Sequence, residues 1–326
     1  MPEPSSPKRR GRLFRCGAAF VALLAVAGYL VVQYVTGGSG GPGCKVVSGD
    51  GDGASYEFTP EQAVNAATIS AVGTARGLPE RAVTIALATA LQESALRNIK
   101  HGDRDSLGLF QQRPSQGWGT PKEIMDPTYS AGEFYDHLVK VPGYTRLPLT
   151  VAAQRVQRSG FPQAYAKHEP DAALLAAALT GQSAATLTCE GRPAATRASG
   201  PDGVRAALVR DFGRDVLEPA GAEVGGSSTA TPAPSPSATG GTGGRTVTLP
   251  VTADTSSAAG RSLDQRGWQL AHWAVANASE LHIARVTYAG REWFAGNTAG
   301  EWRTAAEQGT AGAERDADAV RIVTMR

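Results

Sequence analysis

The residue best placed to do chemistry is Glu93, which follows a stretch without charge. Residues 82–92 read AVTIALATALQ and carry apolar side chains on every helical face, which predicts a buried central helix with Glu93 at its C-terminal end. The apolar wall, the negative end of the helix dipole and the absence of Lys or Arg before Arg97 would raise the pKa of this carboxyl. A carboxylic acid that stays protonated near neutral pH can protonate the leaving oxygen of a glycosidic bond. The alternative is an ordinary exposed Glu at a helix end.

A second motif follows Glu93 at a defined spacing. Glu93-Ser94 precedes SLGLFQ at residues 106–111, so that the Gln closing this element lies 18 residues after Glu93. The pair resembles the motifs of lytic transglycosylases and goose-type lysozymes over about residues 60–180. The resemblance implies a lysozyme-like fold and cleavage of the MurNAc–GlcNAc bond of peptidoglycan, with Glu93 acting first as acid and then as base. The base step would draw the sugar's own C6 hydroxyl onto C1 and give a 1,6-anhydro product, as in transglycosylases.

The resemblance also implies side chains that bind the glycan. The candidates for N-acetyl and hydroxyl groups are Ser106, Gln111 and Gln112. Trp118 is a candidate stacking wall for a sugar, or else a loop Trp that covers the core.

One motif of the family is missing. These enzymes usually carry a later A-Y-N-A-G, whose Tyr contacts the catalytic Glu, whereas this chain has VAAQRVQRSGFPQAYAKHE. Gln154 stands where that Tyr is expected, and Tyr165 is the alternative, displaced along the chain and also consistent with a half-buried core aromatic. The departure leaves open altered product chemistry, weak activity, or glycan binding without cleavage.

A second catalytic carboxylate is not evident. Asp103 and Asp105 flank Arg104 in HGDRDS, and this composition is typical of a turn held by ion pairs. The sequence therefore favours a mechanism with a single acid over the two carboxylates of most glycosidases.

Helices must position Glu93 and the loop that follows it. Thr59 with Gln62 predicts a capping box, and further starts are predicted at Pro79 and at Asp126-Pro127. Additional helices are expected near 149–158, 170–181 and 201–218, with a long loop over 96–126. These elements predict a mainly α, lysozyme-like domain at residues 56–219.

The N-terminal residues predict a membrane anchor. A basic tail (1–15) precedes an apolar run (16–35) that is long enough for one transmembrane helix, and a Gly-rich spacer follows (36–55). A cleaved signal peptide is the alternative. The rest of the chain would lie outside the cytoplasmic membrane, where Cys44 and Cys189 are expected to form a disulfide rather than remain two unrelated thiols.

A Gly/Ser/Thr/Pro linker at 220–245 predicts a separate small α+β domain at 246–326. This domain resembles one found on actinobacterial cell-wall proteins and related to D-Ala-D-Ala carboxypeptidase-like zinc peptidases. Their D-H-V-H strand is replaced by Asp318-Ala319-Val320-Arg321, so that no metal and no cofactor is expected. His272 and His282 are expected at the surface or at an edge.

The net charge of the chain is only +2, which argues against a nucleic-acid partner. Even this small excess is local, because the first fifteen residues alone contribute +4. The expected partners are peptidoglycan glycan strands and, through one helix, the cytoplasmic membrane; the oligomeric state stays open. Two further hypotheses are a non-catalytic wall-binding scaffold with two degenerate enzyme-like domains, and a structural protein without ligand.

Overall fold

The computed structural model describes residues 43–160, 162–196, 198–217, 244–251, 260–297, 301–305 and 319–326. They all belong to one compact unit, Pro42–Arg326. No helix within these ranges is both long and apolar enough to cross a membrane. The predicted basic tail (1–15) and the predicted anchor (16–35) lie outside the described residues.

A three-stranded antiparallel sheet holds the first described residues. Its strands are β1 (Cys44–Val47), β2 (Ser55–Phe58) and β3 (Leu187–Cys189), in the order β2-β1-β3. Cys44 and Cys189 face each other across β1 and β3 and form a disulfide with an S–S distance of 2.02 Å. The predicted disulfide is thereby confirmed.

The predicted fold class, a mainly α lysozyme-like domain after one transmembrane helix plus a small α+β C-terminal domain, was wrong: the described chain is a mixed α/β fold with two antiparallel sheets, one of them formed by strands within the domain expected to be mainly α. One reason is that strand β1 lies where a Gly-rich spacer was expected. Its side chains alternate, with Cys44 and Val46 buried and Lys45 and Val47 exposed. A strand of four residues in a Gly-rich segment shows too few periods for this alternation to be recognised in the sequence.

Helices form most of the chain between β2 and β4. They are α2 (Pro60–Ala75), α3 (Glu80–Ser94), α4 (Pro121–Ile124), α5 (Pro127–Leu138), α6 (Leu149–Gln157), α7 (Glu169–Leu179) and α8 (Gly200–Phe212), with 3-10 helices η1 (Pro114–Gln116), η2 (Pro162–His168) and η3 (Arg214–Leu217). The capping box is confirmed, since Thr59 Oγ1 accepts from the Gln62 backbone N–H and Gln62 Oε1 accepts from that of Thr59.

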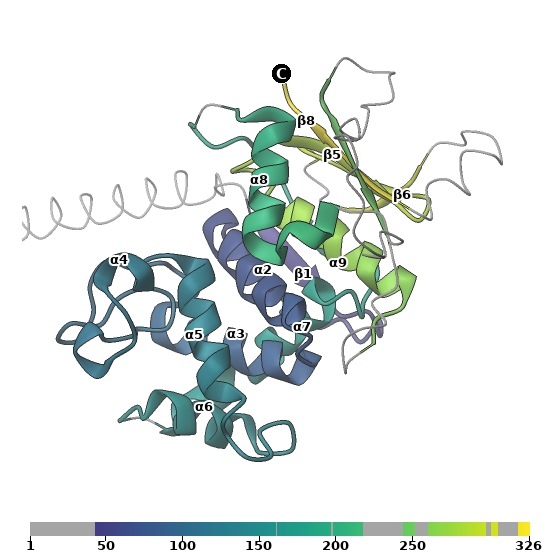
Figure 1. The fold of residues 1–326 in the computed structure, drawn as a ribbon. Helices are drawn as coiled ribbons and strands as arrows, with labels where there is room; N and C mark the ends of the chain where they lie inside the picture. The colour runs from purple at the N-terminus through teal and green to yellow at the C-terminus, as the bar shows by residue number, and fades with distance from the viewer. Residues whose placement is uncertain are drawn as a thin grey trace, which may run out of the picture. The chain divides into compact units, whose positions relative to one another are not determined.

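Helix α3 is the central helix of this region. It is buried from Ala82 to Leu91, as predicted, and packs against α2, α5, α6, η2 and α7 (Figure 1). Because its neighbours cover it on all sides, only its ends reach the surface of the molecule. Its C-terminal end carries Glu93.

The second sheet has five strands. They are β4 (Thr246–Pro250), β5 (Ile283–Tyr288), β6 (Arg291–Phe294), β7 (Arg303–Thr304) and β8 (Ala319–Thr324), antiparallel in the order β4-β8-β5-β6-β7. Helix α9 (Leu263–Ala276) packs against β5 and β8, at the upper right of Figure 1.

Helix α9 is covered on its other side by the first part of the chain. It packs against α2, α7 and β3, and its side chains belong to the same hydrophobic core. Fully buried Gln269 donates from Nε2 to Thr74 Oγ1 of α2 at 2.6 Å. The indole N–H of Trp302 donates to the carbonyl of Leu187 at 2.9 Å. The C-terminal segment and the helices before it therefore share a core.

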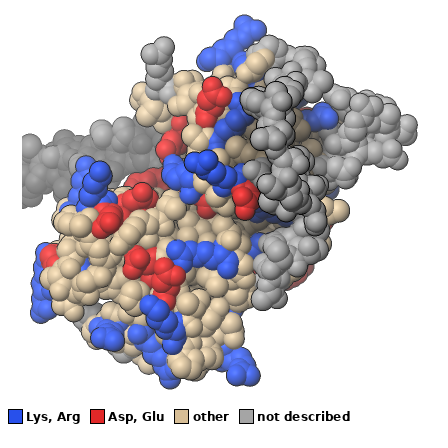
Figure 2. Space-filling model, viewed as in Figure 1, with Lys and Arg blue, Asp and Glu red and all other residues tan. Residues whose placement is uncertain are grey.

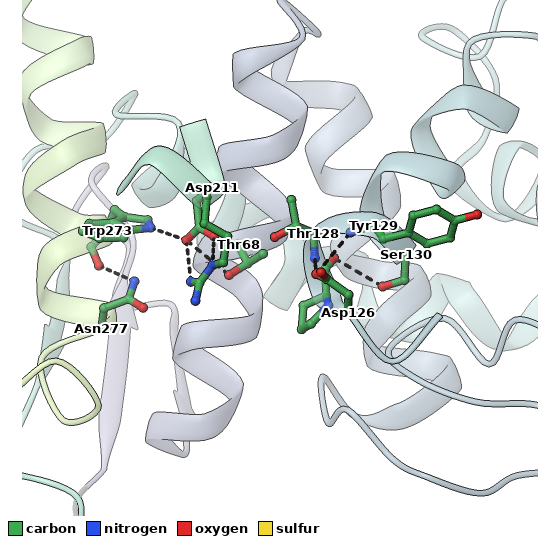
Figure 3. A network of polar contacts seen from close by, with 10 residues as sticks. Thr68, Asp126, Thr128, Tyr129, Ser130, Asp211, Trp273 and Asn277 are labelled. Atoms are coloured by element: carbon green, nitrogen blue, oxygen red, sulfur yellow. Dashed lines mark hydrogen bonds and ion pairs between the residues drawn. The ribbon is translucent and has the colours of Figure 1, made fainter. Parts of the chain in front are cut away.

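A buried carboxylate joins three of these helices (Figure 3). The side chain of Asp211 in α8 is fully buried. Its oxygens accept from Trp273 Nε1 of α9 at 2.8 Å, from Arg210 Nε at 2.7 Å and from Thr68 Oγ1 of α2 at 3.4 Å. These donors replace the water that the carboxylate loses on folding.

Candidate functional site

Three segments meet at Glu93, which lies half-buried in the last turn of α3. Tyr165 of η2 is fully buried and donates its hydroxyl to Glu93 Oε1 at 2.7 Å. Gln157, the last residue of α6, hydrogen-bonds the same carboxylate. Gln157 Nε2 also donates to the carbonyl of Phe110 at 2.7 Å, which ties the carboxyl to the SLGLFQ loop.

Burial raises the pKa of Glu93, and the hydrogen bonds from Tyr165 and Gln157 lower it by less. Burial also raises the pKa of Tyr165, and the neighbouring carboxylate adds to that effect, so that the phenol stays protonated and keeps donating. The outcome is a carboxyl that holds its proton above the usual range and, once ionised, has two donors in place. Such a group can give a proton to a substrate oxygen and take one back.

The backbone after Glu93 is bent sharply. Ala95 and Leu96 both have positive φ, 53° and 57°, which costs energy for residues with a side chain. Two amides of α2 hold this bend, since Gln62 Nε2 donates to the carbonyl of Ala95 and Asn65 Nδ2 to that of Leu96, both at 2.8 Å. Helix α2 therefore fixes where the chain leaves the site.

The SLGLFQ loop is tied to the end of α3 and closed on itself. Ser94 Oγ donates to the carbonyl of Leu109 at 2.8 Å. Leu107 and Gln112 form an isolated antiparallel bridge with N···O distances of 2.9 and 3.0 Å. Gly108 has a φ of 74°, and a Cβ there would lie 2.7 Å from the carbonyl oxygen of Ile124, so that glycine is required. The side chain of Phe110 is buried, and its backbone carbonyl accepts the hydrogen bond from Gln157.

The predicted sugar-binding residues of this loop are engaged within the protein. Ser106 is buried, and Gln112 donates from Nε2 to the carbonyl of Ser130 in α5 at 2.9 Å. Gln111 is half-buried and donates from Nε2 to the carbonyl of Gly108 at 3.2 Å. Their roles toward a glycan remain predictions.

Trp118 and Gln154 contact other parts of the chain. The half-buried ring of Trp118 lies against His137 of α5, with a centroid distance of 4.2 Å. Gln154 donates from Nε2 to the carbonyl of Ser159 at 2.8 Å. Of the two candidates for the missing Tyr, Tyr165 makes the contact with Glu93. Gln157 was not singled out by the sequence, although it stands one helical turn after Gln154.

Asp105 is held by its own loop. Its oxygens accept from Arg113 Nε at 2.7 Å and from the backbone N–H of Ser115 at 2.9 Å. Hydrogen bonds from the side chain of Ser115, from Arg113 and from the Ser115 backbone hold the pKa of Asp105 well below the usual range, so that it stays a carboxylate fixed to the loop. Asp103 is almost fully exposed and lies 3.9 Å from Arg104. The expected structural use of this GDRD turn agrees with these contacts, although Arg113 rather than Arg104 holds Asp105.

The expectation for two histidines was wrong. His272 is fully buried: its Nδ1 lies 2.8 Å from the carbonyl of Ala178, and its Nε2 accepts from the Thr186 backbone N–H at 3.2 Å. Burial lowers its pKa to about 4, so that it is a neutral core residue. His282 is also buried, with Nε2 at 3.2 Å from Thr196 Oγ1. Within the ranges that the structure describes, no group of three His, Cys, Asp or Glu is placed to hold a metal ion.

A family model described as VldE, C-terminal domain, matches residues 232–315. The described part of this match contains β4, α9, β5, β6 and β7, whereas Glu93 and its neighbours lie outside it. No curated protein matches the chain.

Proposed function

We propose that this protein cleaves the glycan strands of peptidoglycan with Glu93 as its general acid and base. The observation that carries the proposal is the pairing of Glu93, whose pKa is raised by burial, with the buried hydroxyl of Tyr165. A carboxyl in such surroundings suits protonation of a glycosidic oxygen. The resemblance of Glu93-Ser94 and SLGLFQ to lytic transglycosylases gives the substrate class.

In the first step the Glu93 carboxyl gives its proton to the oxygen of the leaving sugar, and the C1–O bond breaks. The carboxylate that results is stabilised by the hydrogen bonds from Tyr165 and Gln157. In the second step the carboxylate removes a proton from the group that attacks C1, and the acid is restored. That group is the C6 hydroxyl of the same sugar, which gives a 1,6-anhydro product, or water, which gives a reducing end.

The experiment compares the full chain with its Glu93→Gln variant on purified peptidoglycan, with soluble products identified by mass spectrometry. Glu93→Gln keeps the shape and removes the proton, so that product release should fall by about 10² to 10⁴. The matched control is Glu80→Gln, at the other end of the same helix, where burial also raises the pKa of the carboxyl. Equal release by wild type and Glu93→Gln would remove Glu93 from the mechanism, and no release by either chain would leave glycan binding without cleavage as the better hypothesis.

A further inference from the structure

The chain between α5 and α7 carries charge of one sign. Between Asp136 and Glu169 there is no acidic residue, but there are five basic ones: Lys140, Arg146, Arg155, Arg158 and Lys167. All five are exposed. Within the described part of the chain none of them forms an ion pair. We call these five side chains the basic rim.

Three members of the basic rim lie on, or directly after, the elements that hold Glu93: Arg155 on α6, Arg158 at the end of α6 and Lys167 on η2. Both α6 and η2 pack against α3. Arg158 directly follows Gln157, and Lys167 stands two residues after Tyr165. Figure 2 shows several Lys and Arg side chains at the lower end of the molecule, where Figure 1 has α6, and others over its middle and top, whereas most of the Asp and Glu side chains in view lie nearer its middle.

This concentration of charge is local. The net charge of the whole chain is only +2, and the first fifteen residues already contribute more than that. The rest of the chain outside the basic rim is therefore negative. A local excess of exposed positive charge attracts polyanions, and salt screens this attraction only partly within about 10 Å.

We propose that the basic rim binds anionic groups of the cell-wall polymer whose glycan enters the Glu93 site, an inference that rests on the proposed function. Exposed Lys and Arg recognise carboxylate and phosphate by the same chemistry. Carboxylates would come from the peptide stems of peptidoglycan, and phosphates from phosphate polymers attached to it. The disulfide between Cys44 and Cys189 favours an oxidising compartment outside the cytoplasm. The polyanions expected there are cell-wall polymers rather than nucleic acids.

The test measures binding to purified cell-wall sacculi by co-sedimentation. The full chain carries Glu93→Gln throughout, so that the polymer is not cut during the assay. The test variant is Arg155→Gln, Arg158→Gln and Lys167→Gln together. The matched control is Arg214→Gln, Arg291→Gln and Arg326→Gln, which removes the same charge from exposed positions elsewhere. Urea midpoints verify that both variants fold.

The test variant should bind about tenfold more weakly at low salt, since each exposed contact contributes modestly, and its binding should depend less on salt. The control should bind like its parent. Two treated preparations identify the source: sacculi stripped of phosphate polymers by hydrofluoric acid, and sacculi whose carboxylates are amidated. The treatment after which parent and test variant bind equally is the one that has removed the ligand.

Two results would overturn the proposal. One is equal binding of the test variant and its parent to untreated sacculi. The other is tighter binding of the parent to duplex DNA or to anionic lipid vesicles than to sacculi at the same charge concentration. Cleavage is measured separately with the wild-type chain. Weakened binding by the test variant together with no cleavage by wild type would support the basic rim and overturn only the proposed function.

Discussion

The hydroxyl of Tyr165 lies 2.7 Å from Oε1 of Glu93, although 72 residues separate the two in the sequence. Burial raises the pKa of Glu93, and this hydrogen bond opposes the effect because it stabilises the ionised form. The pKa of Glu93 therefore depends on a hydroxyl group from another element of the fold. Removing that hydroxyl alone separates the two influences.

Tyr165→Phe should raise the pKa of Glu93 further. The protonated acid then persists to higher pH, so that the alkaline limb of kcat/KM for peptidoglycan cleavage should move to higher pH. The rate at the optimum should fall about ten- to a hundredfold, because the ionised carboxyl loses a donor. Tyr144→Phe is the control, since Tyr144 is half-buried and lies near Tyr135 of α5, and its profile should stay in place. An alkaline limb that is unchanged, or moved to lower pH, would show that the hydroxyl does not set this pKa.

The raised pKa of Glu93 also predicts how stability depends on pH. The folded chain keeps this proton over a range in which the unfolded chain, with a carboxyl pKa of about 4.3, has lost it. Stability therefore falls as pH rises through that range. Glu93→Gln removes this cost and should increase the free energy of unfolding at about pH 8, whereas the two chains should converge below about pH 4.

Urea denaturation at both pH values checks this expectation. Glu61→Gln, at an exposed position on α2, is the matched change and should bring no gain at the higher pH. A Glu93→Gln chain that is less stable than wild type at pH 8 would mean that the carboxylate contributes more as a hydrogen-bond acceptor than its burial costs.

Gln157 should matter more than Gln154, although both lie on α6. Gln157→Leu keeps the side-chain volume and removes the amide that hydrogen-bonds Glu93. The same amide donates from Nε2 to the carbonyl of Phe110 at 2.7 Å. We expect kcat to fall about tenfold, a typical effect of removing one hydrogen bond to a charged group. Gln154→Leu removes a bond to the carbonyl of Ser159 and should cost less. Steady-state kinetics on both variants decide the matter, and a larger loss for Gln154→Leu would reverse the assignment.

What the sequence could predict at this site was local. An uncharged helix that ends in Glu93 is a pattern of adjacent residues, and so is the Thr59 capping box. The contact between Glu93 and Tyr165 is different, because it depends on where the chain turns after α6. Arg158 ends that helix with a φ of 52°, and η2 then brings Tyr165 back to α3. No periodicity in the sequence predicts that the chain after α6 turns back to α3.

The same limit explains the error at His272. Residues 266–277 predict a helix with one buried face that contains Leu270, Trp273 and Ala274. The structure places α9 between the five-stranded sheet and α2, α7 and β3, so that His272 is buried as well. A helix covered on two sides cannot be told from a surface helix when its second covering lies far away in the sequence.

The Asp211 carboxylate should be among the most sensitive positions for stability. Its side chain is fully buried and accepts from Arg210, Thr68 and Trp273. Asp211→Ala leaves the buried indole N–H of Trp273 without its acceptor, which costs about 1–3 kcal/mol, whereas the guanidinium of Arg210 is 44% exposed and can turn to water. The loss should appear as a lower urea midpoint in the full chain.

Asp202→Ala is the matched change on the same helix, because Asp202 is almost fully exposed and pairs with Arg205 at 2.8 Å. An exposed pair of this kind contributes only about 0–1 kcal/mol, so that the urea midpoint of Asp202→Ala should stay near that of wild type.

Asp211 connects α2, α8 and α9. We expect the C-terminal sheet of Asp211→Ala to unfold together with the helices, in one transition that Trp fluorescence and circular dichroism both report. Two separate transitions in Asp211→Ala would instead mean that the core shared through α9 does not make the two parts fold as one unit.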